Sequence, residues 1–306
     1  MRILITGHSG FVGRHLAAHL QDAGAEVFGL SSDGAEAGGI EAYGVDLLDR
    51  VAIGEAMAHC EPDAVVHLAG LSHVGESWKV PGEYLRVNFG GSWNMLRAAR
   101  ERSCRFVFAS SAEVYGVVPE SEQPIGEERP LDPRSPYAMT KACAETLARD
   151  HGAILVRSFN VVGPGQSRQF ALPSFAHQLA SIARGEREAV LKVGDLSPRR
   201  DFLHIADAVE GYRVVLERGE PGRVYNLAGG QPISIREALE RLMAISGVEA
   251  EIQPAPERMR PVDMPLLCGR NQALRDLGWA PQHTVDDALE ALWQATRDGH
   301  QGETRS

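Results

Sequence analysis

The chain has 306 residues, of which 43% are hydrophobic and 24% are charged, so it can bury a large core. Its formal net charge of -10 at pH 7 argues against a nucleic-acid partner, because such partners select basic surfaces. There is no uncharged apolar stretch of about 18 residues and no signal-peptide layout, which predicts a cytoplasmic protein with no membrane partner. The 4 cysteines and 11 histidines show no disulfide or metal-ligand spacing, so we expect no metal site.

The opening segment has the order strand, glycine loop, helix. Arg2 to Thr6 is a short apolar run with β-branched residues, and Arg14 to Leu20 has helical spacing. Between them lie Gly7, Gly10 and Gly13, spaced G-x-x-G-x-x-G rather than the commoner G-x-G-x-x-G. Glycines here permit a tight turn and a close approach to a pyrophosphate, whose charge the helix N-terminus favours. The segment therefore predicts dinucleotide binding.

Further apolar, β-rich runs alternate with stretches of helical periodicity. The expected strands are Glu26 to Leu30, Ala64 to Leu68, Arg105 to Ala109, Ala153 to Arg157 and Arg223 to Leu227. This alternation predicts an α/β fold, a Rossmann-like doubly wound parallel sheet with a smaller C-terminal α/β lobe. We expect a dinucleotide-binding domain over residues 1–160 and a second lobe over 161–306, from which residues 205–230 are candidates to return to the first domain.

Small and polar residues follow these strands. They are Gly7, the HLAG turn at His67 to Gly70, Ser110, Ser111 and Asn160. In a parallel sheet, ligands bind beyond the carboxyl ends of the strands. The sequence therefore predicts that these residues line one crevice.

The segment SPYAMTK supplies the strongest catalytic signal. Tyr137 and Lys141 are four residues apart, so on a helix they share one face. A phenol with a pKa of ~10 is a poor acid or base at neutral pH, and a fixed ammonium beside it favours the phenolate. Ser111 lies at a strand end with Glu113 two residues on, where its hydroxyl can hydrogen-bond a substrate oxygen beside the tyrosine. The pattern predicts acid–base catalysis.

The second half of the chain carries helix signals. Leu172 to Arg184 has helical spacing, Ser234 with Glu237 forms a capping box for a helix from 235 to 246, and Thr284 caps a helix from 285 to 297. His204 precedes a helix, which predicts a capping role rather than metal binding. The polar tail from 298 to 306 is expected to fray.

These residues together carry a resemblance. The chain contains, in the order expected of the extended short-chain dehydrogenase/reductases, the motifs GHSGFVG, HLAG, SSAEVYG, YAMTK, SFNVVGPGQ and RRDFLHIAD. The likeness covers nearly the whole chain. More narrowly, it resembles the GDP-mannose-modifying branch at Gly163 to Gln166, Val193 to Phe202 and Arg260 to Gly269. The resemblance implies that the second lobe binds a nucleotide sugar.

The resemblance also implies site residues. The implied catalytic residues are Ser111, Tyr137, Lys141 and Glu113. The implied cofactor-binding residues are Gly7, Gly10, Phe11, Val12, Gly13, Ser31, Ser32, Asp46, Leu47, Leu68, Ala69, Gly70, Asn88, Ser110, Tyr137 and Lys141. The implied substrate-binding residues are Ser72, Ser111, Glu113, Asn160, Lys192, Arg200, Arg260 and Asp263. Arginine suits a diphosphate independently of the resemblance, because its guanidinium binds phosphate with two charge-assisted hydrogen bonds.

The second expected strand bears on the choice of cofactor. An acid at its end would bind the 2′-hydroxyl of NAD and repel the 2′-phosphate of NADP. The segment offers Ser31 and Ser32 there, with Asp33 one position later, and no arginine. We therefore expect NADPH or NADH, with a slight preference for NADPH.

Three reactions share this machinery: reduction, dehydration and epimerisation. Pro-Leu-Leu after Asp263 and the compact length look more like a GDP-4-keto-6-deoxy-D-mannose reductase, whose product would be GDP-D-rhamnose or GDP-6-deoxy-D-talose. Glu113 leaves a GDP-mannose 4,6-dehydratase open, and another nucleotide-sugar 4-epimerase also stays open. A sensor that binds NADP without turnover would lack Tyr137 or Lys141, and both are present. Relatives pair through the helix that carries Tyr137 and the helix before it, which implies a homodimer.

Overall fold

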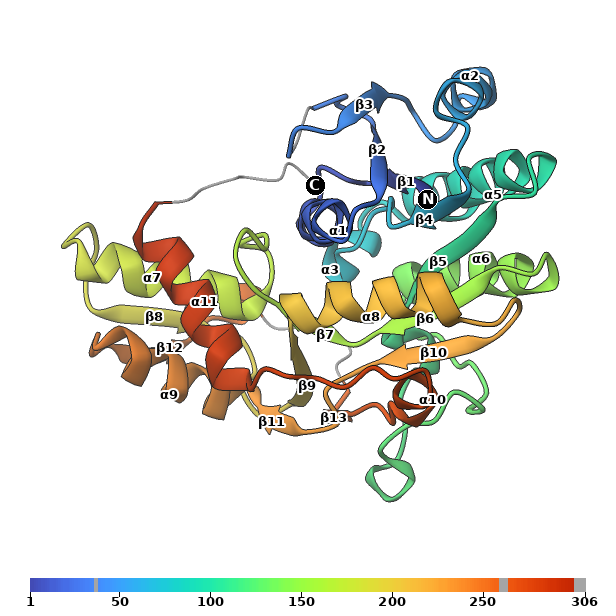
Figure 1. The fold of residues 1–306 in the computed structure, drawn as a ribbon. Helices are drawn as coiled ribbons and strands as arrows, with labels where there is room; N and C mark the ends of the chain where they lie inside the picture. Colours follow the sequence, from blue (N-terminus) through green and yellow to red (C-terminus); the bar gives the residue numbers. More distant parts are fainter. Residues whose placement is uncertain (36–37, 259–263, 300–306) are drawn as a thin grey trace.

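The computed structural model describes residues 1–35, 38–258 and 264–299. Its largest element is a parallel sheet built, in chain order, from β1 (Arg2–Thr6), β2 (Glu26–Ser31), β3 (Glu41–Gly44), β4 (Ala64–His67), β5 (Arg105–Ser111), β6 (Ile154–Ser158) and β10 (Val224–Leu227). The seven strands lie in the order β10-β6-β5-β4-β1-β2-β3 (Figure 1). The chain therefore reverses its direction of winding between β1 and β4, where open α/β sheets bind ligands.

Helices cover both faces of this sheet because its strands are apolar on both sides. One face carries α1 (Phe11–Asp22) and α8 (Ile205–Arg218), and the other carries α2 (Arg50–Cys60), α5 (Ser92–Glu101) and α6 (Pro136–Asp150). Strand β1 shows the alternation: Ile3 and Ile5 enter the core under α1 and α8, whereas Leu4 enters the core on the opposite face. The prediction of a doubly wound α/β fold is confirmed.

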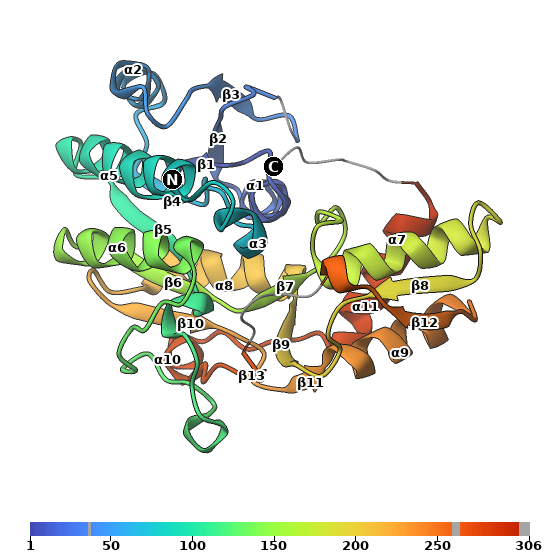
Figure 2. The same ribbon diagram turned by 180° about the vertical axis from the view of Figure 1, so that it is seen from behind.

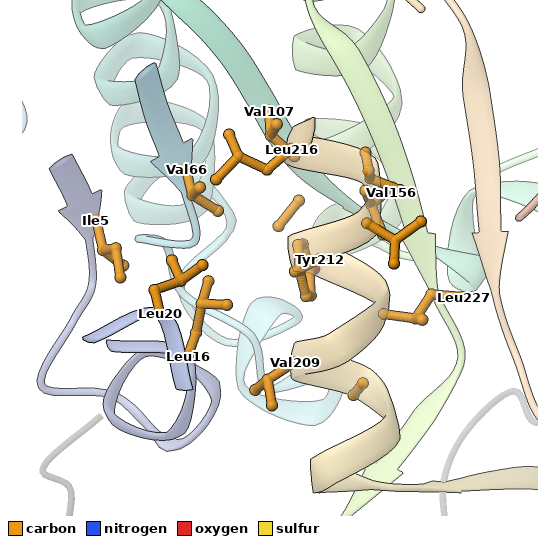
Figure 3. Packing of buried hydrophobic residues seen from close by; sticks show 14 of the residues in the cluster. Ile5, Leu16, Leu20, Val66, Val107, Val156, Val209, Tyr212, Leu216 and Leu227 are labelled. Atoms are coloured by element: carbon orange, nitrogen blue, oxygen red, sulfur yellow. The ribbon is translucent and has the colours of Figure 1, made fainter. Parts of the chain in front are cut away.

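Helix α8 is the main covering element on its face (Figure 3). Val209, Tyr212 and Leu216 of α8 belong to the same buried cluster as Val107 of β5 and Val156 of β6. In Figure 3, Leu216 lies next to Val107, and Val209 lies on the side of α8 toward Leu16 of α1. All of these side chains are buried. Helix α8 therefore covers the central strands β5 and β6, although it follows them by about 50 residues or more in the sequence.

A smaller lobe lies beside the sheet, with its own apolar core (Figure 2). It contains α7 (Ala171–Ala183), β8 (Val190–Val193), α9 (Ile235–Ser246), β12 (Glu251–Pro254) and α11 (Val285–Arg297). Between this lobe and the large sheet run β7 (Asn160–Val162), β9 (Arg199–His204), β11 (Pro232–Ser234) and β13 (Leu266–Leu267), all of which belong to a second sheet around β9. Helix α10 (Gln272–Asp276) packs against β10.

Shorter helical turns complete the described chain. They are α3 (Val74–Ser77), α4 (Pro81–Tyr84), the π-helical segment η1 (Leu85–Gly91), and the 3-10 turns η2 (Ala112–Tyr115), η3 (Glu120–Glu122) and η4 (Pro256–Arg258). Among the helices of the described residues, none has the length and apolar character needed to cross a membrane.

The predicted helix caps can be compared with the structure. Thr284 and Asp287 form both hydrogen bonds of a capping box at α11, and Ser234 accepts the amide of Glu237 at 3.0 Å. His204 caps α8 by accepting the amide of Ala206 at 3.0 Å. Strand β10 pairs with β6, so the segment from α8 to β10 lies with the large sheet. The boundary between two domains at residue 160 stays a prediction.

Candidate active site

The glycine loop follows β1 and leads into α1. Gly7 has a φ of 71°, and a Cβ there would lie 2.9 Å from the Cα of Ala69. Gly10 precedes α1 without any side chain that caps the helix. The first amides of α1 therefore remain available to an anion, and the backbone leaves room for its close approach. This loop fits the pyrophosphate of a dinucleotide, with Phe11, Val12 and Gly13 forming the first turn of the helix.

The carboxylate of Asp33 lies close to the end of β2. Asp33 accepts hydrogen bonds from Ser31, the last residue of β2, at 2.6 Å and from Ser9 of the glycine loop at 3.3 Å. The bond from Ser31 is the main cause that lowers the pKa of Asp33, so the group is ionised at neutral pH. Asp33, two residues beyond β2, is therefore an ionised carboxylate close to the strand end at which Ser31 and Ser32 lie. Ser32 is exposed.

A buried histidine supports the turn after β4. His67 makes hydrogen bonds to Thr6 at 2.7 Å and to Ser92 at 2.9 Å, while Thr6 also accepts the amide of Ala69 at 3.2 Å. Burial lowers the pKa of His67 to about 3, so its imidazole is neutral. The predicted cofactor residues of this turn are Leu68, Ala69 and Gly70.

Asn88 fixes the same turn from the opposite side. Its amide oxygen accepts the Leu71 amide at 2.8 Å, and its NH₂ group donates to the Leu71 carbonyl at 2.9 Å and to Thr140 at 3.2 Å. These contacts tie the turn to α6. Direct contact between Asn88 and a cofactor stays a prediction.

The predicted adenine-side residues follow β3. Asp46 is exposed, and its carboxylate accepts the amide of Leu48 at 2.9 Å. Leu47 is buried, and its carbonyl accepts from Asn94 at 2.9 Å. The exposed carboxylate of Asp46 lies on a segment whose shape is fixed by the buried neighbour.

Tyr137 lies at the start of α6, where Ser135 caps the helix by accepting the amide of Ala138 at 3.1 Å. Its side chain is buried, and its hydroxyl hydrogen-bonds Ser111 of β5. Burial raises the pKa of Tyr137 well above that of a free phenol; the bond with Ser111 lowers it, and the nearby Glu113 raises it. A buried phenol of this kind keeps its proton at neutral pH.

Lys141 lies one turn along α6 and is also buried. Its ammonium donates to the carbonyl of Ala109 at 2.8 Å, and burial lowers its pKa to about 8. We expected this lysine to bring the tyrosine toward the phenolate, but burial dominates and the pKa of Tyr137 moves upward instead. In the structure Tyr137 therefore holds its proton at neutral pH.

Ser110 and Glu113 adjoin this pair. The Ser110 hydroxyl donates to the buried carboxylate of Glu145 at 2.5 Å, so any contact of Ser110 with a cofactor would use its backbone. Glu113 is half-buried in η2, and its amide donates to the Ser111 hydroxyl at 3.2 Å. Both residues thus bear on the position of Ser111.

Two predicted substrate residues lie on β7 and β9, which pair with each other. The amide oxygen of Asn160 is buried and has no hydrogen-bond partner among the described residues. Arg200 of β9 is 4% exposed and donates to the carbonyls of Arg199 at 2.8 Å and Met264 at 2.7 Å. An unsatisfied buried oxygen is costly, which marks Asn160 as a candidate ligand contact.

The remaining predicted substrate residues are less defined. Lys192 lies exposed on β8, and Ser72 lies exposed before α3. Arg260 and Asp263 lie outside the described residues. The roles of all four stay predictions.

Two residues that the sequence analysis did not single out join the glycine-loop helix to the smaller lobe. Arg14 donates to the carbonyl of Gly165 at 3.1 Å, and the His15 ring bonds the carbonyl of Pro164 at 2.9 Å. Both lie in α1 directly after the glycine loop, but their partners are about half the chain away. Only the folded chain could identify them.

No group of three or more His, Cys, Asp or Glu side chains in residues 1–35, 38–258 and 264–299 is arranged to hold a metal ion.

Comparisons with known proteins agree with this geometry. Residues 3–228 match the model of the NAD dependent epimerase/dehydratase family. The chain is 38% identical over 300 residues to a GDP-6-deoxy-D-mannose reductase of Pseudomonas aeruginosa, covering 95% of both chains. It is 32% identical to a UDP-glucose 4-epimerase of Bacillus subtilis, covering 96% of both.

Solved structures give the same picture. The structure of RMD from Pseudomonas aeruginosa complexed with NADPH aligns with a TM-score of 0.87 and 36% identity, covering 98% of this chain and 100% of that one. The UDP-glucose 4-epimerase of Thermus thermophilus, in complex with NAD, aligns with a TM-score of 0.88 and 29% identity, covering 97% and 99%.

Proposed function

This chain belongs to the NAD dependent epimerase/dehydratase family, and we propose that it reduces the 4-keto group of GDP-4-keto-6-deoxy-D-mannose. The observation that carries the proposal is its 38% identity, over 95% of both chains, to a GDP-6-deoxy-D-mannose reductase. The buried tyrosine supports it, because a phenol that holds its proton suits a reaction that must protonate a new alkoxide.

The glycine loop and the first turn of α1 would hold the pyrophosphate of NADPH or NADH. When bound, the nicotinamide supplies a hydride to C4 of the sugar. Tyr137 gives its hydroxyl proton to the oxygen on C4, so the carbonyl becomes a hydroxyl. Ser111 bonds the same oxygen and orients it beside the tyrosine. Lys141 stands one turn behind, where its ammonium helps the phenol to release its proton and can hold the nicotinamide ribose.

The substrate would lie between β5 and β7. Asn160 would satisfy its buried amide oxygen on a sugar hydroxyl. Arg200, Lys192 and the arginine at position 260 would meet the diphosphate, since cations must offset the chain's negative charge at that point. Asp263, Ser72 and Glu113 complete the proposed substrate contacts, with Asp263 on the nucleoside ribose.

Two observations bear on the cofactor. The similar RMD structure is complexed with NADPH, which supports NADPH. The ionised Asp33 at the end of β2 favours the 2′-hydroxyl of NADH. We propose that the enzyme accepts both, with Ser31 and Ser32 close to the adenosine ribose and Asp46 at the adenine.

We further propose a homodimer in the cytoplasm. Leu85 of η1 and Met139 of α6 are 54% and 50% exposed, and both lie on the segments through which relatives are expected to pair. Large exposed apolar side chains on these segments support burial by a second copy. The cysteines at positions 60, 104, 143 and 268 are all free, which suits a reducing compartment.

The test is to supply purified protein with GDP-4-keto-6-deoxy-D-mannose and either reduced cofactor. We expect loss of nicotinamide absorbance and a product with two more hydrogen atoms, and NMR of C4 will distinguish GDP-D-rhamnose from GDP-6-deoxy-D-talose. In a parallel reaction with GDP-mannose, release of water would favour a dehydratase. Interconversion of two sugars without net oxidation of cofactor would favour an epimerase.

A further inference from the structure

The last three residues of β5 each bind α6. In order along the strand, the contacts are the carbonyl of Ala109 with the Lys141 ammonium at 2.8 Å, the hydroxyl of Ser110 with the Glu145 carboxylate at 2.5 Å, and the hydroxyl of Ser111 with Tyr137. On α6 the partners Tyr137, Lys141 and Glu145 are spaced by four residues, so they share one face of the helix. Glu145 therefore lies on the same face of α6 as the proposed catalytic pair, Tyr137 and Lys141.

Glu145 is a buried charge with a specific partner. Its side chain is 2% exposed and that of Arg157, on β6, is 3% exposed. The Arg157 Nε lies 3.1 and 3.2 Å from the two carboxylate oxygens, and one terminal nitrogen donates at 2.5 Å. The carboxylate thus accepts from Arg157 and from Ser110 together, which ties α6 to β5 and β6.

The guanidinium extends this connection to the sheet edge. Arg157 lies 4.7 Å over the ring of Tyr115, whose hydroxyl donates to Asn226 of β10 at 2.7 Å. Arg157 also donates to the carbonyl of Glu127 at 3.1 Å. Arg157 is therefore held on several sides, and the carboxylate that it holds is fixed with it.

A buried ion pair is weak evidence for stability, because desolvation offsets most of the attraction. The pair instead holds the Glu145 carboxylate in one place. Because the Ser110 hydroxyl bonds that carboxylate, the end of β5 is also held in place against α6. Ser110 and Ser111 are adjacent at the end of β5, so the backbone position that brings Ser110 to Glu145 also sets where the Ser111 side chain begins. Fixing Ser110 on Glu145 hence helps to fix Ser111 beside Tyr137.

We propose that Glu145 and Arg157 are positioning residues for catalysis, which hold Ser110 so that Ser111 meets Tyr137 and the substrate oxygen. The proposal rests on the proposed function, since it concerns the same reaction. It extends the spacing Y-x-x-x-K by one turn to Y-x-x-x-K-x-x-x-E, with an arginine on the neighbouring strand as the fourth member.

The first test is Ser110→Ala, which removes the hydroxyl and leaves the ion pair intact. We expect kcat to fall about tenfold, the change that one buried hydrogen bond of ~1.4 kcal/mol would give. KM for the sugar and Kd for NADPH should stay within about twofold of the parent, because neither ligand touches this hydroxyl. Thr296→Val, which removes a buried hydroxyl bonded to Leu292 on α11, is the matched control and should leave kcat unchanged.

The second test removes the pair as a unit. Glu145→Leu alone leaves the Arg157 charge buried and is expected to unfold, so Glu145→Leu is combined with Arg157→Met. We expect this double variant to fold with a Tm near that of the parent and to lose about as much kcat as Ser110→Ala. Adding Ser110→Ala to it should then cost nothing more. A folded double variant with full kcat would overturn the proposal. So would a triple variant whose loss of kcat equals the product of the losses in Ser110→Ala and in the double variant.

A readout without turnover separates this proposal from the proposed function. With tyrosine labelled at the ring carbon bearing oxygen, the NMR signal of Tyr137 is the one absent in Tyr137→Phe. Because the Ser111 hydroxyl hydrogen-bonds the phenol oxygen, Ser110→Ala and the double variant should change the chemical shift of that signal at neutral pH, whereas Thr296→Val should not. An unmoved signal contradicts the positioning role, even if the substrate proves to be a different sugar. Conversely, if the parent protein does not turn over the proposed substrate but the Tyr137 signal shifts in the variants, only the proposed function is rejected.

Discussion

The two sides of the candidate crevice differ in how completely their polar groups are paired. On the side of β5 and α6, Tyr137, Lys141 and Ser110 each have a partner within the fold. On the side of β7, the buried oxygen of Asn160 has none among the described residues. The comparison teaches that the proton-transfer side is set before any ligand arrives, whereas the sugar side leaves a bond for the ligand to complete.

The largest effect on kcat should come from removing the Tyr137 hydroxyl on the side of β5 and α6. Tyr137→Phe removes the only proposed proton donor, so kcat should fall about 10²- to 10⁴-fold, the usual contribution of a general acid. Oxidation of NADPH by GDP-4-keto-6-deoxy-D-mannose, followed by absorbance, measures it. Kd for NADPH should hardly change. Full turnover by this variant would remove Tyr137 from the mechanism.

The second prediction concerns the free energy of unfolding, which the buried Lys141 ammonium on the same side lowers. Lys141 has a pKa of about 8 in the fold against 10.5 in a free chain, so between these values the unfolded chain binds more protons and stability rises with pH. Below pH 8 the buried charge costs the full amount. In unliganded protein Lys141→Met should therefore raise the free energy of unfolding by about 2 kcal/mol at pH 7, after allowance for the lost bond to Ala109.

Urea unfolding at a series of pH values measures this difference. The advantage of Lys141→Met should shrink from pH 8 upward, vanish near pH ~9.5, and reverse slightly above pH 10.5, where only the lost bond to Ala109 remains. A constant difference at all pH values would show that the charge of Lys141 is not the cause. Turnover of the variant should be lost, which separates its catalytic value from its effect on stability.

The third prediction probes the incomplete side. Asn160→Ala should raise KM for the sugar about tenfold, through loss of one hydrogen bond worth ~1.4 kcal/mol, without lowering stability. The matched control is Asn226→Ala on β10, because Asn226 is fully buried and its side chain is paired with Tyr115, Ile125 and Arg270. That variant should lose stability instead. Equal losses of stability in both variants would contradict the comparison.

The smallest expected effect lies at the adenosine end. Asp33→Ser removes a charge that would repel a 2′-phosphate with about 1 kcal/mol at a few ångströms in water, so the ratio of kcat/KM for NADPH over NADH should rise roughly fivefold. Parallel assays with both cofactors give the ratio. Asp46→Asn, which neutralises a carboxylate farther along the chain, serves as the control. An unchanged ratio in Asp33→Ser would place the 2′-position elsewhere.

The sequence could predict what depends on local spacing. Tyr137 and Lys141 share a helix face because they are four residues apart, and the glycine loop is recognisable because strand and helix flank it. It could not predict the pKa of Tyr137, since burial by distant segments decides its direction. Nor could it pair Glu145 with Ser110, 35 residues away, because i+8 spacing on a helix says nothing about which strand lies opposite.

The same limit applies elsewhere in the fold. Asp33 follows the strand end by two residues, but its carboxylate turns back to Ser31 and Ser9, which counting along the chain could not foresee. The substrate lobe was the hardest part, because Asn160 and Arg200 come from strands that meet only in the second sheet. Motif resemblance named these residues without showing their contacts.

The place of β10 in the large sheet has a consequence for biosynthesis. Because β10 covers the edge of β6 and α8 covers one face, a nascent chain that has emerged only to Phe159 exposes an unpaired strand edge and bare valines. At 5–20 residues per second, translation from there to the end of β10 takes roughly 3–14 s. We expect the incomplete chain to bind chaperones during that interval. We also expect a fragment released from a ribosome stalled there to aggregate through its exposed strand edge.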